Sequence, residues 1–533
     1  MIQPDELKKN TPLLWSTGTG TDVWELFCAC SAGDLTTVTR LIDKDPSLVR
    51  CHYEYRKPLT FAVRANQLAV AAHLLERDPD PAGLAFNDSL LQITRDRGYA
   101  EMATLLETTL ARKHNASPRG EPVATAIRER DLPKVRSLLD ATPDLLHAGD
   151  QGGNQPIHWA VMTRQPAVID ELLARGANIE ARRPDGARPI HLFNGDYHYR
   201  GWRDVPGDVT TTPAEVLAHL RSRGAYCDMN TAAHTGDLAR VKELLVEDPS
   251  LANRVGEHGG YYLGGGSPLR NAAARGHMEI VTLLLSSGAD PNLPEEGIAP
   301  LGHALYSAVY NGHHEIARLL LERGAHPSPP VESSADALSI AIMNKDQQMI
   351  ELLSSCGSAR SVELLAYYGD VQTAAAVFAI DPSLADDPGA FSSAAGNGHE
   401  AFIRLMLHHQ PDLIKRVSCG AKTPALTEFL FERGMDPSRP NWLGVTQLHH
   451  FAGGGHIEQA TVFIDHGADL HARDEENCST PLGWAAKAGR RNMVELLLNR
   501  GAQRIHPDDP PWATPLAWAT RRGHDDIVRI LQP

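Results

Sequence analysis

A segment of about 33 residues recurs along almost the whole chain. The stretches STPLGWAAKAGRRNMVELLLNRGA from Ser479 and ATPLAWATRRGHDDIVRILQ from Ala513 align without a gap. Further copies begin at Lys57, Gln155, Ser267 and His303. A fixed period of this length means that each unit buries its apolar face only against its neighbours. The repetition therefore predicts an array of stacked units in place of several separate globular cores.

Each unit carries two helical periods separated by a turn that holds a glycine or a substitute for it. These turn residues are Gly33, Asn66, Gly98, Arg130, Arg164, Gly236, Gly276, Gly312, Lys345, Gly369, Gly398, Gly455, Gly489 and Gly523. The steps from Arg164 to Gly236 and from Gly398 to Gly455 are about twice the usual length. Each long step is predicted to contain one further irregular unit, which gives about sixteen units in all.

The local chemistry of a unit fits a helix pair. Thr480 can cap a first helix, Pro481 suits its first turn, and Leu482 enters the core. The apolar residues of MVELLLNRGA fall at helical spacing, and Gly501 supplies a left-handed stop.

The stretch SPLRNAAARGHMEIVTLLLSSGAD, from Ser267 to Asp290, resembles the signature of the ankyrin-repeat family in nearly complete form. The resemblance extends from about residue 23 to the end of the chain, and the nearest likeness is to long bacterial members of the family. It implies an all-α fold, an ankyrin-repeat solenoid of about sixteen helix pairs with finger loops, without a sheet. In this family, partners usually dock in the concave groove formed by the fingers and the first helices.

Departures from the pattern indicate the domain organisation. We expect an N-terminal segment (1–22), a first block of three repeats (23–111), a linker or kink (112–121) and a main block (122–533) with an insertion at 194–213. The linker assignment rests on RKHNASPRGE, which has no apolar periodicity.

Composition narrows the classes of partner. Lys and Arg number 51 against 66 Asp and Glu, a net charge of −15, which disfavours a nucleic-acid partner. No apolar run is long enough to span a membrane, and the first thirty residues lack the features of a signal peptide, so we expect a cytoplasmic protein without a membrane partner. The seven cysteines are scattered and predict neither disulfides nor a zinc site. We expect no metal and no cofactor.

The insertion is the largest anomaly, and its side chains are of the types that dominate binding hot spots. The alternative is that these aromatics only cover neighbouring helices. A second anomaly is the glycine-rich finger 255–267, and three further tyrosines precede turn glycines on the predicted groove. The binding candidates are Tyr197, Tyr199, Arg200, Trp202, Arg203, Tyr261, Tyr262, Tyr310, Tyr367 and Tyr368.

Two functions remain open. The first is a non-enzymatic protein-interaction scaffold that binds a protein or an extended peptide in the groove near the central repeats. The second is an enzyme for a small, sugar-like substrate, with an acid/base pocket built from the insertion and the fingers 255–267 and 291–303. Its catalytic candidates are Asp196, His198, Glu257, His258, Glu295, Glu296 and Glu332. Histidines at motif positions, such as His158, His191, His449, His277, His313, His456 and His524, are interpreted as structural.

Overall fold

The computed structural model describes residues 1–77, 84–85, 88–115, 118–150, 152–195, 201–256, 258, 264–332 and 335–532. The candidates Asp196, Tyr197, His198, Tyr199, Arg200, Glu257, Tyr261 and Tyr262 lie outside these residues. The chain divides into two compact units. The larger unit comprises 9–95 and 99–359, and the smaller comprises 360–533 together with Met1–Lys8 and Asp96–Gly98. The segment 112–121 lies inside the larger unit, where one α-helix ends at His114 and the next α-helix begins at Glu121.

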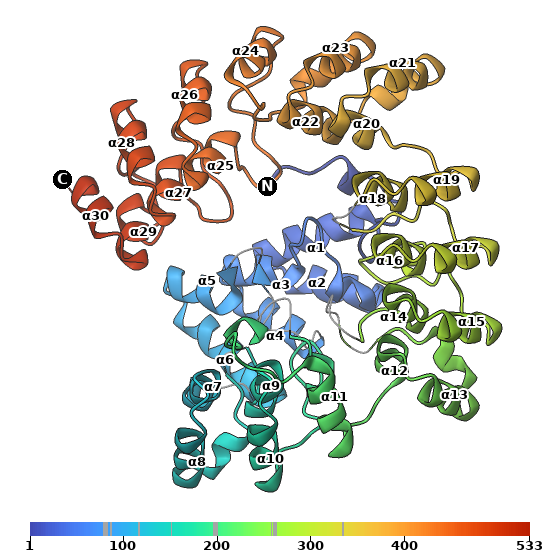
Figure 1. The fold of residues 1–533 in the computed structure, drawn as a ribbon. Helices are drawn as coiled ribbons and strands as arrows, with labels where there is room; N and C mark the ends of the chain where they lie inside the picture. The colour runs from blue at the N-terminus through green and yellow to red at the C-terminus, as the bar shows by residue number, and fades with distance from the viewer. Residues whose placement is uncertain are drawn as a thin grey trace. The chain divides into compact units, whose positions relative to one another are not determined.

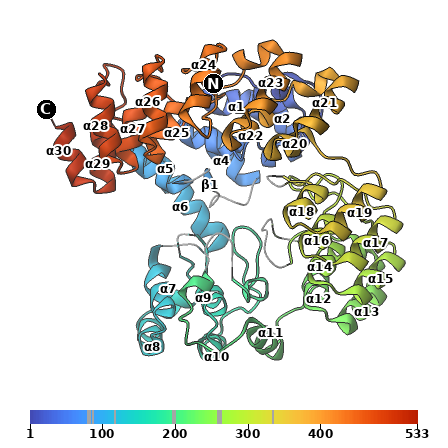
Figure 2. The same cartoon turned by 45° about the horizontal axis from the view of Figure 1, so that its top comes forward.

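The larger unit is a series of antiparallel helix pairs, each with a first (inner) and a second (outer) helix. The pairs are α1 (Gly20–Ala32) and α2 (Leu35–Lys44), α3 (Pro58–Arg64) and α4 (Leu68–Arg77), α5 (Leu90–Arg97) and α6 (Ala100–His114), α7 (Glu121–Arg128) and α8 (Leu132–Ala141), α9 (Pro156–Met162) and α10 (Pro166–Ala174), α12 (Met229–Thr235) and α13 (Leu238–Glu247), α14 (Pro268–Arg275) and α15 (Met278–Ser286), α16 (Ala304–Tyr310) and α17 (His314–Glu322), and α18 (Ala337–Met343) and α19 (Gln347–Ser355). Figures 1 and 2 show the last three of these pairs side by side in chain order.

The smaller unit continues the same pattern. Its pairs are α20 (Val362–Tyr368) and α21 (Val371–Ile380), α22 (Pro388–Asn397) and α23 (Glu400–His409), α25 (Gln447–Gly454) and α26 (Ile457–Asp465), α27 (Pro481–Lys487) and α28 (Arg491–Asn499), and α29 (Pro515–Arg522) and α30 (Asp525–Leu531). Short 3-10 helices precede, connect or replace these elements: Glu6–Lys8, Pro46–Arg50, Pro118–Gly120, Pro143–Leu146, Pro189–Leu192, Gly201–Asp204, Pro249–Asn253, Pro382–Ala385 and Pro411–Lys415.

The two long steps each contain one further unit, as the sequence predicts, but each of these units keeps only its outer helix. These outer helices are α11 (Pro213–Ser222) and α24 (Pro424–Glu432). In the first case a 3-10 turn, Pro189–Leu192, stands in place of the inner helix. The described residues therefore form fourteen helix pairs and two irregular units with a single α-helix, which agrees with the prediction of about sixteen units.

The all-α fold is as predicted, and among the described residues the expectation of no sheet is corrected only by one short hairpin. Strands β1 (Leu84–Ala85) and β2 (Asp88–Ser89) pair antiparallel, with Leu84 opposite Ser89.

The turn residues have the backbone conformation that the sequence pattern requires. Gly276 has φ +77°, and the substitutes Asn66, Arg130 and Lys345 adopt left-handed φ values of 56°, 61° and 57°. A residue with a Cβ is mildly strained in this conformation, which explains why glycine is the common choice. Between the turns, apolar side chains form a cluster from Val123 to Leu353 in the larger unit and another from Leu365 to Leu531 in the smaller.

Candidate functional site

The finger that precedes α16 is organised around a buried carboxylate. Glu295 is 2% exposed and accepts hydrogen bonds from the backbone N–H of Ser267 (3.1 Å) and from Nη1 of Arg270 (3.2 Å). Its Oε2 also lies 3.3 Å from Nδ1 of His303, the residue that caps α16. One carboxylate thus joins two neighbouring fingers to the start of an inner helix.

The electrostatics of this cluster follow from its partners. Burial alone would raise the pKa of Glu295, but the hydrogen bond with His303 and the charge of Arg270 outweigh it, so its pKa lies below the ordinary value. Burial lowers the pKa of His303, and Arg270 lowers it further, while Glu295 opposes both. At neutral pH the carboxylate is therefore charged, and a neutral His303 donates to it.

An aromatic series leads from this cluster to the surface along α16. The rings of His303 and Tyr306 lie 5.4 Å apart, and those of Tyr306 and Tyr310 lie 6.1 Å apart with 22° between their planes. Tyr306 is 7% exposed and Tyr310 is 59% exposed. On the adjacent inner helix α18, Met343 stands two residues before the turn residue, as Tyr310 does, and is 51% exposed. We call this pair the Tyr310–Met343 surface.

A second buried cluster lies where the glycine-rich finger meets the unit before it. His191 accepts the backbone N–H of Arg188 at Nδ1, and its Nε2 lies 3.0 Å from Oδ2 of Asp228. Burial opposes the charge of Asp228, but the bond from His191 and the nearby Arg188 outweigh it, so the pKa of Asp228 lies below its usual range. The ring of His258, 4% exposed, lies 4.8 Å from that of His191. His258 is therefore buried beside His191.

The finger of the first repeat contacts later fingers of the same unit. Arg50 forms an exposed, bidentate ion pair with Glu296 at 3.0 and 3.2 Å. Nδ1 of His52 lies 3.8 Å from Oε1 of Glu332, and both side chains are mostly buried. Burial raises the pKa of Glu332 to about 7 and lowers that of His52, so His52 is neutral and Glu332 is partly protonated at neutral pH.

The described part of the insertion packs on the inner helix α9. A Cβ placed on Gly201 would lie 2.7 Å from Cβ of Met162, which shows how closely the backbone approaches that helix. Trp202 is nevertheless 43% exposed, and the guanidinium of Arg203 lies 5.2 Å from the centre of its ring. Trp202 and Arg203 therefore remain binding candidates.

Four stretches of the sequence that forms these helix pairs match models of a known repeat family. The family model described as "Ankyrin repeats" matches residues 229–330, 415–509 and 448–533, and the one described as "Ankyrin repeat" matches 152–183. The chain is an ankyrin-repeat protein.

Three relatives of this ankyrin-repeat protein illustrate where such repeats occur. It is 29% identical over 195 residues to a probable E3 ubiquitin-protein ligase, XBOS32, of rice, which covers 32% of this chain and 39% of the relative. It is 27% identical over 183 residues to the human transient receptor potential cation channel subfamily A member 1, covering 28% and 16%. It is 39% identical over 59 residues to the human scaffold protein ILK, covering 11% and 13%. The chain thus spans two fifths or less of each of these relatives.

Several motif histidines of the ankyrin repeats hydrogen-bond to a backbone carbonyl of a neighbouring repeat. Nε2 of His158 lies 2.9 Å from the carbonyl of Ala181, and Nε2 of His449 lies 3.2 Å from that of Ser479. Nε2 of His191 instead meets the side-chain carboxylate of Asp228. Burial, reinforced by Arg183, lowers the pKa of His158 to about 3.

The structure brings some sequence-predicted residues together and separates others. Glu295 and Glu296 share one finger, but Glu295 points into the protein and Glu296 toward solvent. Tyr367 and Tyr368 lie on α20 in the smaller unit, where both are 46% exposed and their rings meet edge to face.

Sequence reasoning missed His52, Arg270, His303 and Met343. Met343 had a usable signal, since it holds the same place before a turn residue as Tyr310. No sequence signal indicated that His52 pairs with Glu332 or Arg50 with Glu296, because each pair joins fingers more than 240 residues apart.

Among the described residues, no helix is both long and apolar enough to cross a bilayer. Within the same residues, no group of three or more His, Cys, Asp or Glu side chains is arranged to hold a metal ion.

Proposed function

We propose that this ankyrin-repeat protein is an interaction scaffold that binds a partner protein through the Tyr310–Met343 surface. One observation carries the proposal: two adjacent inner helices, α16 and α18, each expose a large apolar side chain at the same position of the repeat. Isolated exposed apolar residues are ordinary, but neighbouring ones on a repeated face favour a binding surface.

The surroundings of Tyr310 support this role. The ring of Tyr306 lies beneath it, and Tyr306 in turn contacts His303, which Glu295 holds in place. A tyrosine on such a support loses little conformational freedom when a partner covers it, and this is why rigid aromatic residues contribute strongly to binding. Tyr310 is therefore the residue we expect to contribute most.

The relatives support protein binding as a role, although not the Tyr310–Met343 surface in particular. One relative is named a scaffold protein, and another a probable E3 ubiquitin-protein ligase. These names describe those proteins, and this chain shares only part of their length. They favour protein binding as the role of the repeats.

A second candidate function rests on Glu332. Its carboxyl group combines burial, a pKa of about 7 and a histidine ring nitrogen at 3.8 Å, a combination suited to proton transfer on a small molecule. A metabolite panel screened by thermal shift tests it. A compound that stabilises the wild-type chain but not Glu332→Gln would favour this candidate, and a panel without such a compound would remove its support.

Site-specific photo-crosslinking tests the leading proposal. A benzophenone amino acid replaces Tyr310 in one variant, Met343 in a second and Val246 in a control. Val246 lies in the last turn of the outer helix α13 and is 85% exposed, so it is an accessible apolar residue on another face. Crosslinking in extracts of the source cells should give the same protein adduct at 310 and 343 and none at 246. Equal adducts at all three positions would contradict the proposal.

A further inference from the structure

The thirteenth repeat, in the smaller unit, lacks its inner helix. Between the 3-10 helix Pro411–Lys415 and α24, the chain runs through residues 416–423 without a helix. Elsewhere in this unit inner helices pack directly on one another, α20 on α22 and α25 on α27. Such packing is absent between α22 and α25, both of which the structure describes in full. Helices α22 and α25 thus both lack the inner helix that would lie between them.

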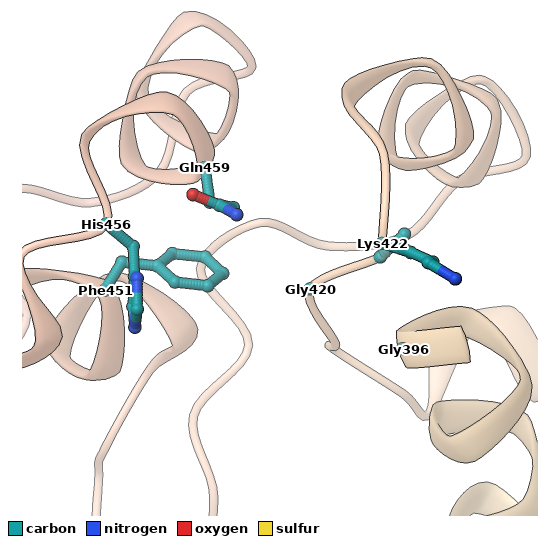
Figure 3. Close-up of a pocket in the computed structure, with 7 residues that line it drawn as sticks. Gly396, Gly420, Lys422, Phe451, His456 and Gln459 are labelled. Atoms are coloured by element: carbon teal, nitrogen blue, oxygen red, sulfur yellow. The ribbon is translucent and has the colours of Figure 1, made fainter. Parts of the chain in front are cut away.

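A pocket of about 270 Å³ lies at this break (Figure 3). Phe451 of α25 turns its ring toward Gly420, and a Cβ on Gly420 would lie only 2.8 Å from the tip of that ring. The aromatic ring thus forms an apolar wall against bare backbone. The lining residues are Gly396, Gly420, Ala421, Lys422, Phe451, His456 and Gln459.

A hydrogen bond that recurs in the array shows what the pocket lacks. The donor is the side chain of the residue that follows a turn residue. The acceptor is a backbone carbonyl near the end of the inner helix of the preceding repeat, and it belongs to the residue two positions before the turn residue of that repeat. This bond joins Gln67 to Ser31, His277 to His234, His399 to Tyr367, Arg490 to Gly453 and His524 to Lys487, at 2.9 to 3.3 Å. Five repeats therefore share one way of fastening an outer helix to the inner helix before it.

His456 occupies this donor position after Gly455, but the preceding repeat has no inner helix to supply a carbonyl. Its side chain makes no hydrogen bond to any residue that the structure describes, and its ring lies 6.4 Å from that of Phe451. On the opposite side, no hydrogen bond among the described residues ends on the carbonyl of Gly396, which is the matching acceptor position of α22. The break thus leaves both halves of the recurring bond without their usual partner.

The side chains at the pocket favour binding of the C-terminal end of a helix, where the last carbonyl groups lack donors within the helix. Lys422 is fixed by its backbone N–H, which donates to the carbonyl of Ala395 at 2.9 Å, and its side-chain stem lies against Gly398. With His456 and Gln459 it supplies three side chains that can donate, and no carboxylate lines the pocket. The last carbonyl groups of a helix carry partial negative charge and attract such donors.

We propose that this pocket receives the C-terminal turn of a helix from a partner protein, which takes the place of the missing inner helix. A terminal carbonyl of that helix accepts from Nε2 of His456, the neighbouring carbonyls face Lys422, and a small apolar side chain packs on Phe451. This site is separate from the Tyr310–Met343 surface, which belongs to the larger unit, and it stands if that surface binds nothing.

A helix from the chain itself provides the probe. An amidated, fluorescein-labelled peptide with the sequence STPLGWAAKAGR, residues 479–490, is locked as a helix by a hydrocarbon staple on its polar side. Its binding to the full-length chain is measured by fluorescence anisotropy. We expect saturable binding that His456→Ala weakens about fivefold, as loss of one hydrogen bond implies. Absence of binding up to millimolar peptide would overturn the proposal.

Two variants make the test specific. Gly396→Phe should abolish binding without disturbing the fold, because a Cβ at Gly396 meets no atom within 4 Å and a phenyl ring would then fill the pocket. His524→Ala is the control, since its donor already has the carbonyl of Lys487, and it should leave the affinity unchanged. Equal binding by all three variants would overturn the proposal. Displacement of the peptide by millimolar acetate would do so as well, because it would identify the pocket as a carboxylate site.

Discussion

The imidazole of His303 and the carboxylate of Glu295 lie 3.3 Å apart, and both side chains are buried. Through this contact a finger loop is joined to the N-cap residue of α16, the inner helix that presents Tyr310. The position of an exposed aromatic side chain thus depends on a polar contact two helical turns away. The contact also supplies a direct test of how much the finger contributes to stability.

Glu295→Ala should destabilise repeats eight and nine by about 3 kcal/mol, because Arg270 and His303 would remain buried without their carboxylate. Glu296→Ala is the matched control. Its side chain is 54% exposed and pairs with an exposed Arg50, so its loss should cost less than about 1 kcal/mol. Amide hydrogen exchange of residues 264–322 measures both effects. Similar losses of protection in the two variants would show that Glu295 does not stabilise the finger.

Glu332 should make the larger unit less stable as the pH rises. Its pKa of about 7 in the folded chain exceeds the value of about 4.3 for an exposed glutamate, so the folded state binds the proton more tightly. Its stabilising contribution is complete below about pH 4 and is lost as the pH rises through 7. Glu332→Gln, which mimics the protonated form, should therefore be more stable than the wild type by roughly 3 to 4 kcal/mol at pH 8 and equal to it at pH 4. A difference independent of pH would contradict the assignment.

Gly201→Ala should loosen the insertion from α9. The added methyl group would stand 2.7 Å from Cβ of Met162 and 3.2 Å from the ring of Trp159, so the short helix at Gly201–Asp204 must move away. Faster cleavage of residues 201–213 by trypsin would report this movement. Gly207→Ala is the control, because its added Cβ meets no atom within 4 Å. If both variants are cut at the wild-type rate, the insertion does not depend on this contact.

Leu497→Ala should destabilise the C-terminal repeats. Leu497 is fully buried in α28, and its truncation should cost roughly 2 to 5 kcal/mol. In an array whose units contact only their neighbours, this loss acts locally, so hydrogen exchange should quicken in residues 481–531 and stay unchanged in α20 and α21. Uniform loss of protection across the smaller unit would contradict a local effect.

Much of the fold could be predicted from the sequence because each repeat carries its own local signals. The turn residues mark the helix pairs, and even Lys345, a poor substitute for glycine, adopts the left-handed conformation. The absence of an inner helix before α24 could also have been predicted, from the spacing of two turn glycines. Gly398 and Gly455 are 57 residues apart, about nine fewer than two ordinary repeats occupy, and nine residues correspond to one short helix.

The candidate site was less predictable, for two physical reasons. Whether a carboxylate is buried or exposed depends on partners supplied by other fingers, so the neighbours Glu295 and Glu296 could not be told apart. Contacts such as that of His52 with Glu332 join distant segments and leave no periodic pattern. The exposed tyrosines were easier to find, since their place before a turn residue recurs in every repeat.

The affinity of Tyr310→Ala for the protein captured at positions 310 and 343 tests the central claim most directly. Isothermal titration calorimetry with the purified adduct partner should show affinity weakened by about 30-fold or more, the usual effect of losing a hot-spot residue. The thermal stability of the free variant should change little, because Tyr310 is 59% exposed. An affinity within twofold of the wild type would contradict the account.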